Sequence, residues 1–205
     1  MKLFLASAIH NTLPLLKTML PNIGNNVLFI ANAADMHADK WFVDIDRKAF
    51  IEQGYQLTEI DLRETSPEQL DNLMGKADTM HICGGSVYYL VSLLRDKGLD
   101  QVIKQAIRDE KIIYTGTSAG SIIVSKNIKP FSYDGEEAPY VKKVPDHTAL
   151  EIIDFSIMPH INSTDFVEEN KKVVENMPKD LEPLFFITDN QTIWIDNNCI
   201  QLLSI

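Results

Sequence analysis

The stretch Gly116-Thr117-Ser118-Ala119-Gly120 lies one residue after an apolar run, Ile112-Ile113-Tyr114, and directly before the helix-compatible residues Ser121-Ile122-Ile123-Val124. A strand, a tight turn and a helix in this order are typical of a nucleophile elbow, in which glycines beside a serine let strand and helix approach closely. The pattern predicts that the Ser118 hydroxyl is held at the carboxyl end of the strand, near a helix N-terminus whose amides stabilise negative charge. A phosphate-binding loop is the alternative, but it lacks the lysine expected after its last glycine.

Short apolar runs alternate with helical patterns along the chain, which predicts an α/β fold with a mainly parallel sheet. Ser66 followed by Pro67 and Gln69 marks one helix start, because this order combines a capping box with a proline at the first helical position. The expected strands are Lys2–Ala8, Asn26–Ala31, Gln56–Leu62, Thr79–Cys83, Lys111–Tyr114 and Phe155–Met158. The expected helices are Thr12–Met19, Ala38–Gln53, Pro67–Lys76, Val87–Asp96, Leu99–Asp109 and Asp165–Asn176.

The last eighty residues are less regular. Lys126–Asp146 is predicted to be a long polar loop of the functional or mobile kind, because prolines and a glycine interrupt it. Three closely spaced runs end the sequence, at Leu184–Thr188, Thr192–Ile195 and Ile200–Ile205, and they predict a small antiparallel hairpin that completes the sheet. No shift in composition marks a linker, so we expect a single domain over residues 1–205.

The composition, with 45% hydrophobic and 23% charged residues among 205, is that of a soluble globular protein whose core needs no disulfide or metal. A net charge of -10 repels phosphate backbones and anionic lipids, which argues against nucleic acid and membrane surfaces as partners. The sequence leaves the oligomeric state open.

The two cysteines, Cys83 and Cys199, are far apart and form no C-x-x-C pair, so they predict neither a disulfide nor a zinc site. We expect no metal and no cofactor, and two reduced thiols in the cytoplasm. The N-terminal apolar run is shorter than a signal peptide needs, which also favours a cytoplasmic location.

A serine nucleophile needs a general base, and His160 is the first candidate. It follows an expected strand at the sheet edge where open α/β folds gather their sites. The other histidines are a second candidate after the first strand, His10; a residue expected in the core, His81; and two expected in solvated loops, His37 and His147.

A second turn of small residues, Cys83-Gly84-Gly85-Ser86, leads from an expected strand into the helix that starts near Val87. Backbone N–H groups in such a turn can point outward. We therefore expect this turn to form an oxyanion hole together with the amide of Ala119, the residue after the serine.

With these residues placed, the sequence resembles the peptidase E family of serine peptidases, family S51, which includes aspartyl dipeptidases and is related to cyanophycinases. The order and spacing of the similar stretches agree over essentially the whole chain. Those stretches are Asn32-Ala33-Ala34-Asp35, Gly84–Leu90, Gly116–Gly120 and Met158-Pro159-His160.

The resemblance implies a three-layer α/β/α sandwich, similar to class I glutamine amidotransferases. It also implies a dipeptidase-like serine peptidase for short peptides. Ser118 would be the nucleophile, His160 the general base, and the Gly85 and Ala119 amides the oxyanion hole. Thr117 and Ser86 replace a tryptophan and an asparagine of the family pattern, which leaves the backbone roles intact but alters the substrate pocket.

The acid of the triad has three candidates. Distance from the serine favours Asp134, the position before x-Pro favours Glu137, and some relatives draw an acid from the region of Asp189. We take Asp134 as the first choice and keep the other two open.

The family preference for an N-terminal aspartate implies an arginine that pairs with the substrate carboxylate. No arginine occurs after Arg108, so strict aspartyl specificity is not expected. The lysines that would have to take its place are Lys142, Lys143, Lys171 and Lys172.

Two other functions fit the same residues: an esterase or acyl hydrolase with the same triad, and a binding module that has lost catalysis. A glutaminase of the amidotransferase type is disfavoured, because the elbow holds a serine rather than a cysteine.

Overall fold

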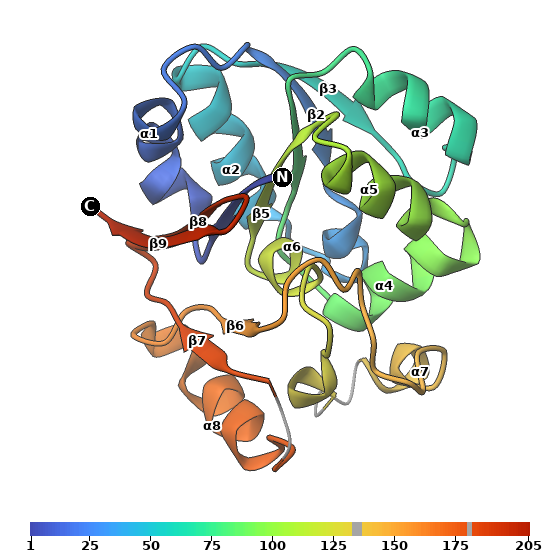
Figure 1. Cartoon of the computed structure of the whole chain (residues 1–205). Helices are drawn as coiled ribbons and strands as arrows, with labels where there is room; N and C mark the ends of the chain where they lie inside the picture. The colour runs from blue at the N-terminus through green and yellow to red at the C-terminus, as the bar shows by residue number, and fades with distance from the viewer. Residues whose placement is uncertain (133–136, 180–181) are drawn as a thin grey trace.

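The computed structural model describes residues 1–132, 137–179 and 182–205. Seven strands form the main sheet (Figure 1); the five nearest the β3 edge run parallel, and the last two pair antiparallel. The mainly parallel sheet and the C-terminal hairpin are therefore confirmed. In spatial order the strands are β3 (Gln56–Ile60), β2 (Asn26–Ile30), β4 (Thr79–Ile82), β5 (Ile113–Thr117), β1 (Lys2–Ala6), β8 (Gln191–Asp196) and β9 (Cys199–Ser204).

Both faces of the sheet are buried, because alternate side chains of the central strands enter different cores. In β1, Leu3 and Leu5 belong to one buried cluster, and Phe4 and Ala6 belong to the other. The result is the expected three-layer α/β/α arrangement (Figure 1). The second cluster lies under α1 (Ile9–Met19) and α2 (Trp41–Glu52), and the first under α3 (Pro67–Met74), α4 (Val87–Asp96) and α5 (Leu99–Arg108).

The predicted start of α3 is confirmed in detail. Ser66 Oγ accepts a hydrogen bond from the Gln69 N–H at 3.2 Å, and Gln69 Oε1 accepts one from the Ser66 N–H at 2.8 Å. These bonds satisfy two backbone donors that have no acceptor within the helix.

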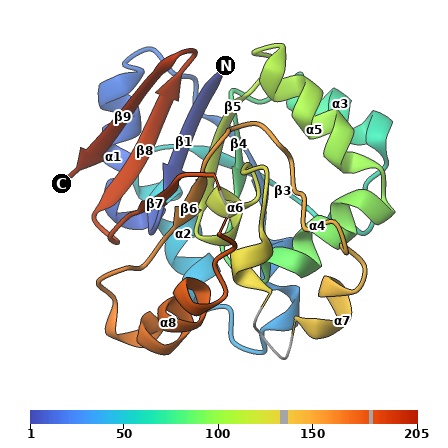
Figure 2. The same ribbon diagram turned by 60° about the horizontal axis from the view of Figure 1, so that its bottom comes forward.

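One of the three C-terminal runs is not part of the hairpin as predicted. Figure 2 shows β9 and β8 beside β1, but β7 (Leu184–Phe186) pairs in parallel with β6 (Ser156–Met158) in a separate two-stranded sheet. A turn closed by a hydrogen bond from the Gln191 N–H to the Thr188 carbonyl separates β7 from β8 and redirects the chain. Between β6 and β7 lie η3 (Thr164–Phe166) and α8 (Val167–Glu175).

The segment predicted as a polar loop contains two short helical turns, η2 (Lys129–Phe131) and α7 (Ala138–Val141). Each carries a proline in its first turn, where the missing N–H has no partner to lose. Phe131 is buried in the core, which anchors this segment. Among the described residues, no helix has both the length and the apolar character that crossing a bilayer requires.

A close backbone approach joins β5 to α6 (Ala119–Ile122), the short helix that follows it. A Cβ atom on Gly120 would lie 2.1 Å from the Ile82 carbonyl oxygen, and one on Gly116 would lie 2.5 Å from the Gly120 carbonyl carbon. Both distances are far inside van der Waals contact, so only glycine fits at either position.

Gly120→Ala is therefore expected to lower the free energy of unfolding by about 2 kcal/mol or more, since the new methyl group meets backbone atoms that cannot rotate away. Gly75→Ala is a matched control, because Gly75 ends α3 with φ -66° and its nearest contact for a Cβ is 3.5 Å. It should change stability by less than about 1 kcal/mol. Urea denaturation measures both variants; equal losses would contradict the packing argument.

Candidate active site

Ser118 connects β5 to α6 in an unusual backbone conformation, with φ 50° and ψ -113°. Its own N–H donates to the Ala6 carbonyl of the neighbouring strand at 3.1 Å, and its carbonyl accepts from the Ser121 and Ile122 amides at 2.8 and 3.0 Å. These bonds hold the sharp turn, so the surrounding backbone determines where the Ser118 side chain points.

His160 follows β6 and also has a positive φ, of 60°. Its Nδ1 lies 2.6 Å from Asp189 Oδ1, and its ring stacks on Phe166 with centroids 4.2 Å apart and planes 14° apart. Its carbonyl accepts a hydrogen bond from Asn170 Nδ2 at 2.9 Å. The imidazole is thus fixed by contacts on one edge and on one face.

Ser7, at the end of β1, joins these groups and was missed in the sequence. Its fully buried hydroxyl accepts from the His160 N–H at 2.8 Å and donates to Asp189 Oδ1 at 2.7 Å. Asn11 adds a bond from Nδ2 to the Asp189 carbonyl at 3.0 Å. A polar residue at the carboxyl end of a central strand was the available signal.

The hydrogen bond with His160 holds the pKa of the Asp189 carboxyl below its ordinary value, against the effect of partial burial, and the bond from Ser7 acts in the same direction. An ionised carboxylate only accepts hydrogen bonds, so the short contact places a proton on His160 Nδ1. The other ring nitrogen, Nε2, is then left with a lone pair.

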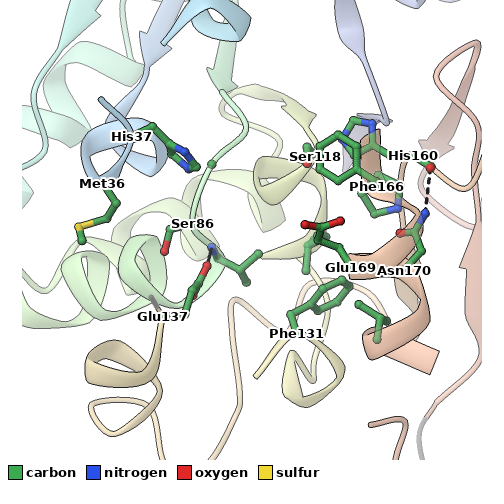
Figure 3. A pocket seen from close by; sticks show the side chains of 15 residues that line it. Met36, His37, Ser86, Ser118, Phe131, Glu137, His160, Phe166, Glu169 and Asn170 are labelled. Carbon is green, nitrogen blue, oxygen red and sulfur yellow. Dashed lines mark hydrogen bonds between the residues drawn. The ribbon is translucent and has the colours of Figure 1, made fainter. Parts of the chain in front are cut away.

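Two cavities, of about 240 and 510 Å³, meet at this point. Figure 3 shows the smaller one, with Ser118, His160 and Phe166 close together at one end and His37 at the other. The residues that line both cavities are His37, Gly85, Ser118, His160, Phe166 and Glu169.

The turn Gly84-Gly85 lies against the serine. A Cβ on Gly84 would stand 3.2 Å from Ser118 Cβ, and one on Gly85, whose φ is 140°, would stand 2.2 Å from the Ala33 carbonyl oxygen. Ala119 is the first residue of α6, where an N–H has no acceptor within the helix. The structure thus brings the Gly85 turn and the start of α6 to the same serine.

Of the three candidate acids, Asp189 is the one that the structure places within hydrogen-bond distance of His160 Nδ1. Glu137 lies across the cavity from His160 (Figure 3), and its carboxylate accepts from the Val87 and Tyr88 amides at 2.8 and 2.7 Å, which caps α4. The first choice, Asp134, falls outside the described residues.

The remaining histidines differ in part from expectation. His81 is fully buried, as expected, and His10 lies 3.5 Å from Asp46 and lines the larger cavity. His147 was expected to be solvated, but it is half-buried and hydrogen-bonds the Tyr88 hydroxyl at 2.8 Å, because the loop folds back onto α4. His37 is exposed, as expected, and it lines both cavities.

The charges around the cavities are mainly negative. Among the described residues, neither cavity is lined by a lysine or an arginine, so the four lysines considered above lie outside the lining. Lys143, for example, pairs with Asp96 at 2.8 Å on the surface. The larger cavity instead contains Asp46, Asp165 and Glu169.

The family model described as Peptidase family S51 matches residues 3–203. The chain belongs to peptidase family S51. It is a serine-type peptidase, and therefore a hydrolase.

Relatives within family S51 cover nearly all of the chain. An uncharacterized peptidase of Pasteurella multocida (strain Pm70) is 33% identical over 199 residues, which make up 96% of this chain and 94% of that protein. Peptidase E of a Nostoc species is 24% identical over 194 residues, covering 92% and 76% of the two chains. A crystal structure of a Listeria monocytogenes protein assigned to peptidase E is 28% identical, with a TM-score of 0.86, and covers 100% of this chain and 98% of that one.

The contact between Asp189 and His160 predicts an acid-sensitive contribution to stability. A carboxyl with a lowered pKa stabilises the fold above its unfolded value of about 4 and loses this contribution as the pH falls through the folded-state value. The difference in unfolding free energy between wild type and Asp189→Asn should therefore shrink as the pH is lowered from about 5 to about 3. Urea denaturation at several pH values measures it, with the exposed Asp154→Asn as the control. A difference that stays constant over this range would contradict the assignment.

Proposed function

We propose that this chain hydrolyses short peptides in a dipeptidase-like manner through a triad of Ser118, His160 and Asp189. The observation that carries the proposal is the 2.6 Å contact of Asp189 with His160 Nδ1, next to a serine held at a strained turn. The turn is the nucleophile elbow that its Gly-x-Ser-x-Gly sequence predicts. Asp189 thus takes the role first assigned to Asp134.

The reaction follows from the position of the protons. Asp189 accepts a hydrogen bond from the Nδ1–H group of His160, so Nε2 is free to take the hydroxyl proton of Ser118 as that oxygen attacks the scissile carbonyl. The imidazolium then gives this proton to the leaving amine, and a water molecule releases the acyl group by the same steps. Ser7 is a positioning residue that keeps base and acid in register.

The negative charge that develops on the carbonyl oxygen needs donors that are already in place. The Gly85 and Ala119 amides supply them in this proposal, since both residues adjoin Ser118 and the latter begins a helix. Glycine is required at position 85, because a side chain would collide with the Ala33 carbonyl.

The alternatives are weighed by the same geometry. A binding module without catalysis would need no oriented imidazole, whereas here Asp189 and Ser7 both hold His160. An esterase would use the same triad, so only the substrate separates it from a peptidase. The proposal includes a cytoplasmic location, which the two free cysteines, Cys83 and Cys199, support.

The charge of the cavities leads to a proposal on substrate preference. Carboxylates of Asp165 and Glu169 border the site, and no described lining residue is a lysine or an arginine. Such a lining attracts the free ammonium group of a peptide and repels an acidic side chain. We therefore place neutral or basic N-terminal residues ahead of aspartate.

Ser118→Ala is expected to abolish labelling by a fluorophosphonate probe, because the probe reacts only with an activated serine. Ser118→Ala and His160→Ala should each lower kcat/KM by at least about 10³-fold, and the double variant should lose little more. Ser92→Ala is the control, since Ser92 is a buried serine on α4 whose hydroxyl donates to the Tyr89 carbonyl of the same helix. Equal labelling of wild type and Ser118→Ala would end the proposal. Activity on p-nitrophenyl esters alone, without peptide hydrolysis, would favour the esterase.

Peptide selectivity tests the charge of the cavity. Wild type should cleave Lys-Leu and Ala-Leu with higher kcat/KM than Asp-Leu, and Glu169→Gln should reduce the Lys-to-Asp ratio by about three- to tenfold. Glu168 is the adjacent residue of α8 and lines neither cavity. Glu168→Gln removes an equal charge and should leave the ratio nearly unchanged. A preference for Asp-Leu in wild type would contradict the electrostatic argument.

A further inference from the structure

Three side chains of types that can bind metal ions lie close together in the core near Ser118. Asp46 comes from α2, His81 from β4, and Cys83 from the turn that follows β4. Their exposed fractions are 1%, 0% and 0%, and one donor atom from each lies within 4.8 Å of the other two. No step of the proposed reaction uses any of them.

The contacts of His81 leave its second ring nitrogen, Nε2, to face Asp46. Its Nδ1 lies 3.0 Å from Thr115 Oγ1, and that hydroxyl also lies 3.3 Å from the Met80 carbonyl. When the hydroxyl donates to the carbonyl, it accepts from His81 Nδ1, and the neutral ring then has a lone pair on Nε2.

That lone pair faces a second acceptor. His81 Nε2 lies 3.6 Å from Asp46 Oδ2, and neither atom has a hydrogen-bond partner among the residues that the structure describes. Two unpaired acceptors that face each other in a buried place are unfavourable unless a positive charge lies between them.

We propose that Asp46, His81 and Cys83 bind a zinc ion. Carboxylate, imidazole and thiolate are the ligands that zinc takes, at about 2.0–2.3 Å, and neighbouring donors around a tetrahedral ion are then about 3.3–3.8 Å apart. The 3.6 Å between Asp46 Oδ2 and His81 Nε2 already meets this spacing, and the donor atoms of all three residues, Cys83 included, lie within 4.8 Å of one another.

The charge and the outer contacts of the site are consistent with zinc. A thiolate and a carboxylate neutralise the dication, and binding releases the Cys83 thiol proton to solvent. The bond from His81 Nδ1 to Thr115 is the outer contact that metal-bound histidines usually make. Asp46 and Thr117 both line the larger cavity, so an ion would reach the site from that cavity.

Sequence spacing does not indicate this site because its donors do not form a metal-binding motif. His81 and Cys83 are two residues apart, so they lie on the same face of β4 and its extension. Asp46 reaches them because α2 packs on that face. The ion would link α2 to the strand that ends in the Gly84-Gly85 turn.

Metal content of tag-free protein tests the proposal. After incubation with zinc chloride and desalting, wild type should retain about one zinc ion per chain by inductively coupled plasma mass spectrometry. Cys83→Ser should bind zinc at least about tenfold more weakly, and Cys199→Ser, which removes the exposed cysteine, should bind like wild type. Wild type without zinc, or equal binding in Cys83→Ser, would overturn the proposal.

Spectroscopy provides a second readout that does not depend on activity. Cobalt bound at the site should show a thiolate-to-cobalt charge-transfer band that is absent in Cys83→Ser and present in Cys199→Ser. If a proton rather than a metal ion lies between Asp46 and His81, nitrogen NMR will show Nε2 of His81 protonated in zinc-treated protein. That result would also overturn the proposal.

Discussion

The surroundings of the reacting serine depend on one close backbone contact, between Gly120 at the start of α6 and the Ile82 carbonyl at the end of β4. The contact lets a helix begin directly above the sheet, so Ser118 must make a sharp turn to reach it. Ser121 Oγ, 2.7 Å from the Ala6 carbonyl and 2.8 Å from the Gly116 carbonyl, supports the turn from below. Hydrogen bonds to β1, to β5 and within the helix itself thus balance the strain of the serine backbone.

A second set of contacts, made by Ser7, positions His160 and Asp189 beside the turn. Ser7 links the end of β1 to both His160 and Asp189, which lie 153 and 182 residues after Ser7 along the chain. Because its hydroxyl accepts from one partner and donates to the other, the two cannot move independently. The scaffold therefore positions Ser118 through local geometry and His160 through long-range hydrogen bonds.

This division explains what the sequence could predict. Ser118 and the Gly84-Gly85 turn were found because a strand, small residues and a helix follow one another within a few positions, and the same local patterns predicted the helices and the parallel strands. The contact of Asp189 with His160 could not be found in this way, because it depends on the pairing of β8 with β1, which no local pattern specifies. Asp134, preferred by its distance along a loop, lies outside the described residues.

Other differences have the same origin. Glu137 was a candidate acid of the triad, and the structure shows it capping α4, 49 and 50 residues away along the chain. The run Leu184–Phe186 has the composition of a hairpin strand, yet it pairs with β6. In both cases the packing of the chain determines the contact partner. The run at Leu184–Phe186 was correctly predicted to be a strand, but its neighbour in the sheet was not.

The pairing of β8 with β1 also determines when the site is assembled during synthesis. A nascent chain can form the sheet from β1 to β5 and the turn at Ser118 before its last residues emerge from the ribosome. Asp189 is placed only when Gln191–Asp196 aligns antiparallel to Lys2–Ala6. Until then His160 lacks the carboxylate of the proposed triad, so in that proposal an unfinished chain holds a serine that cannot yet attack its neighbours.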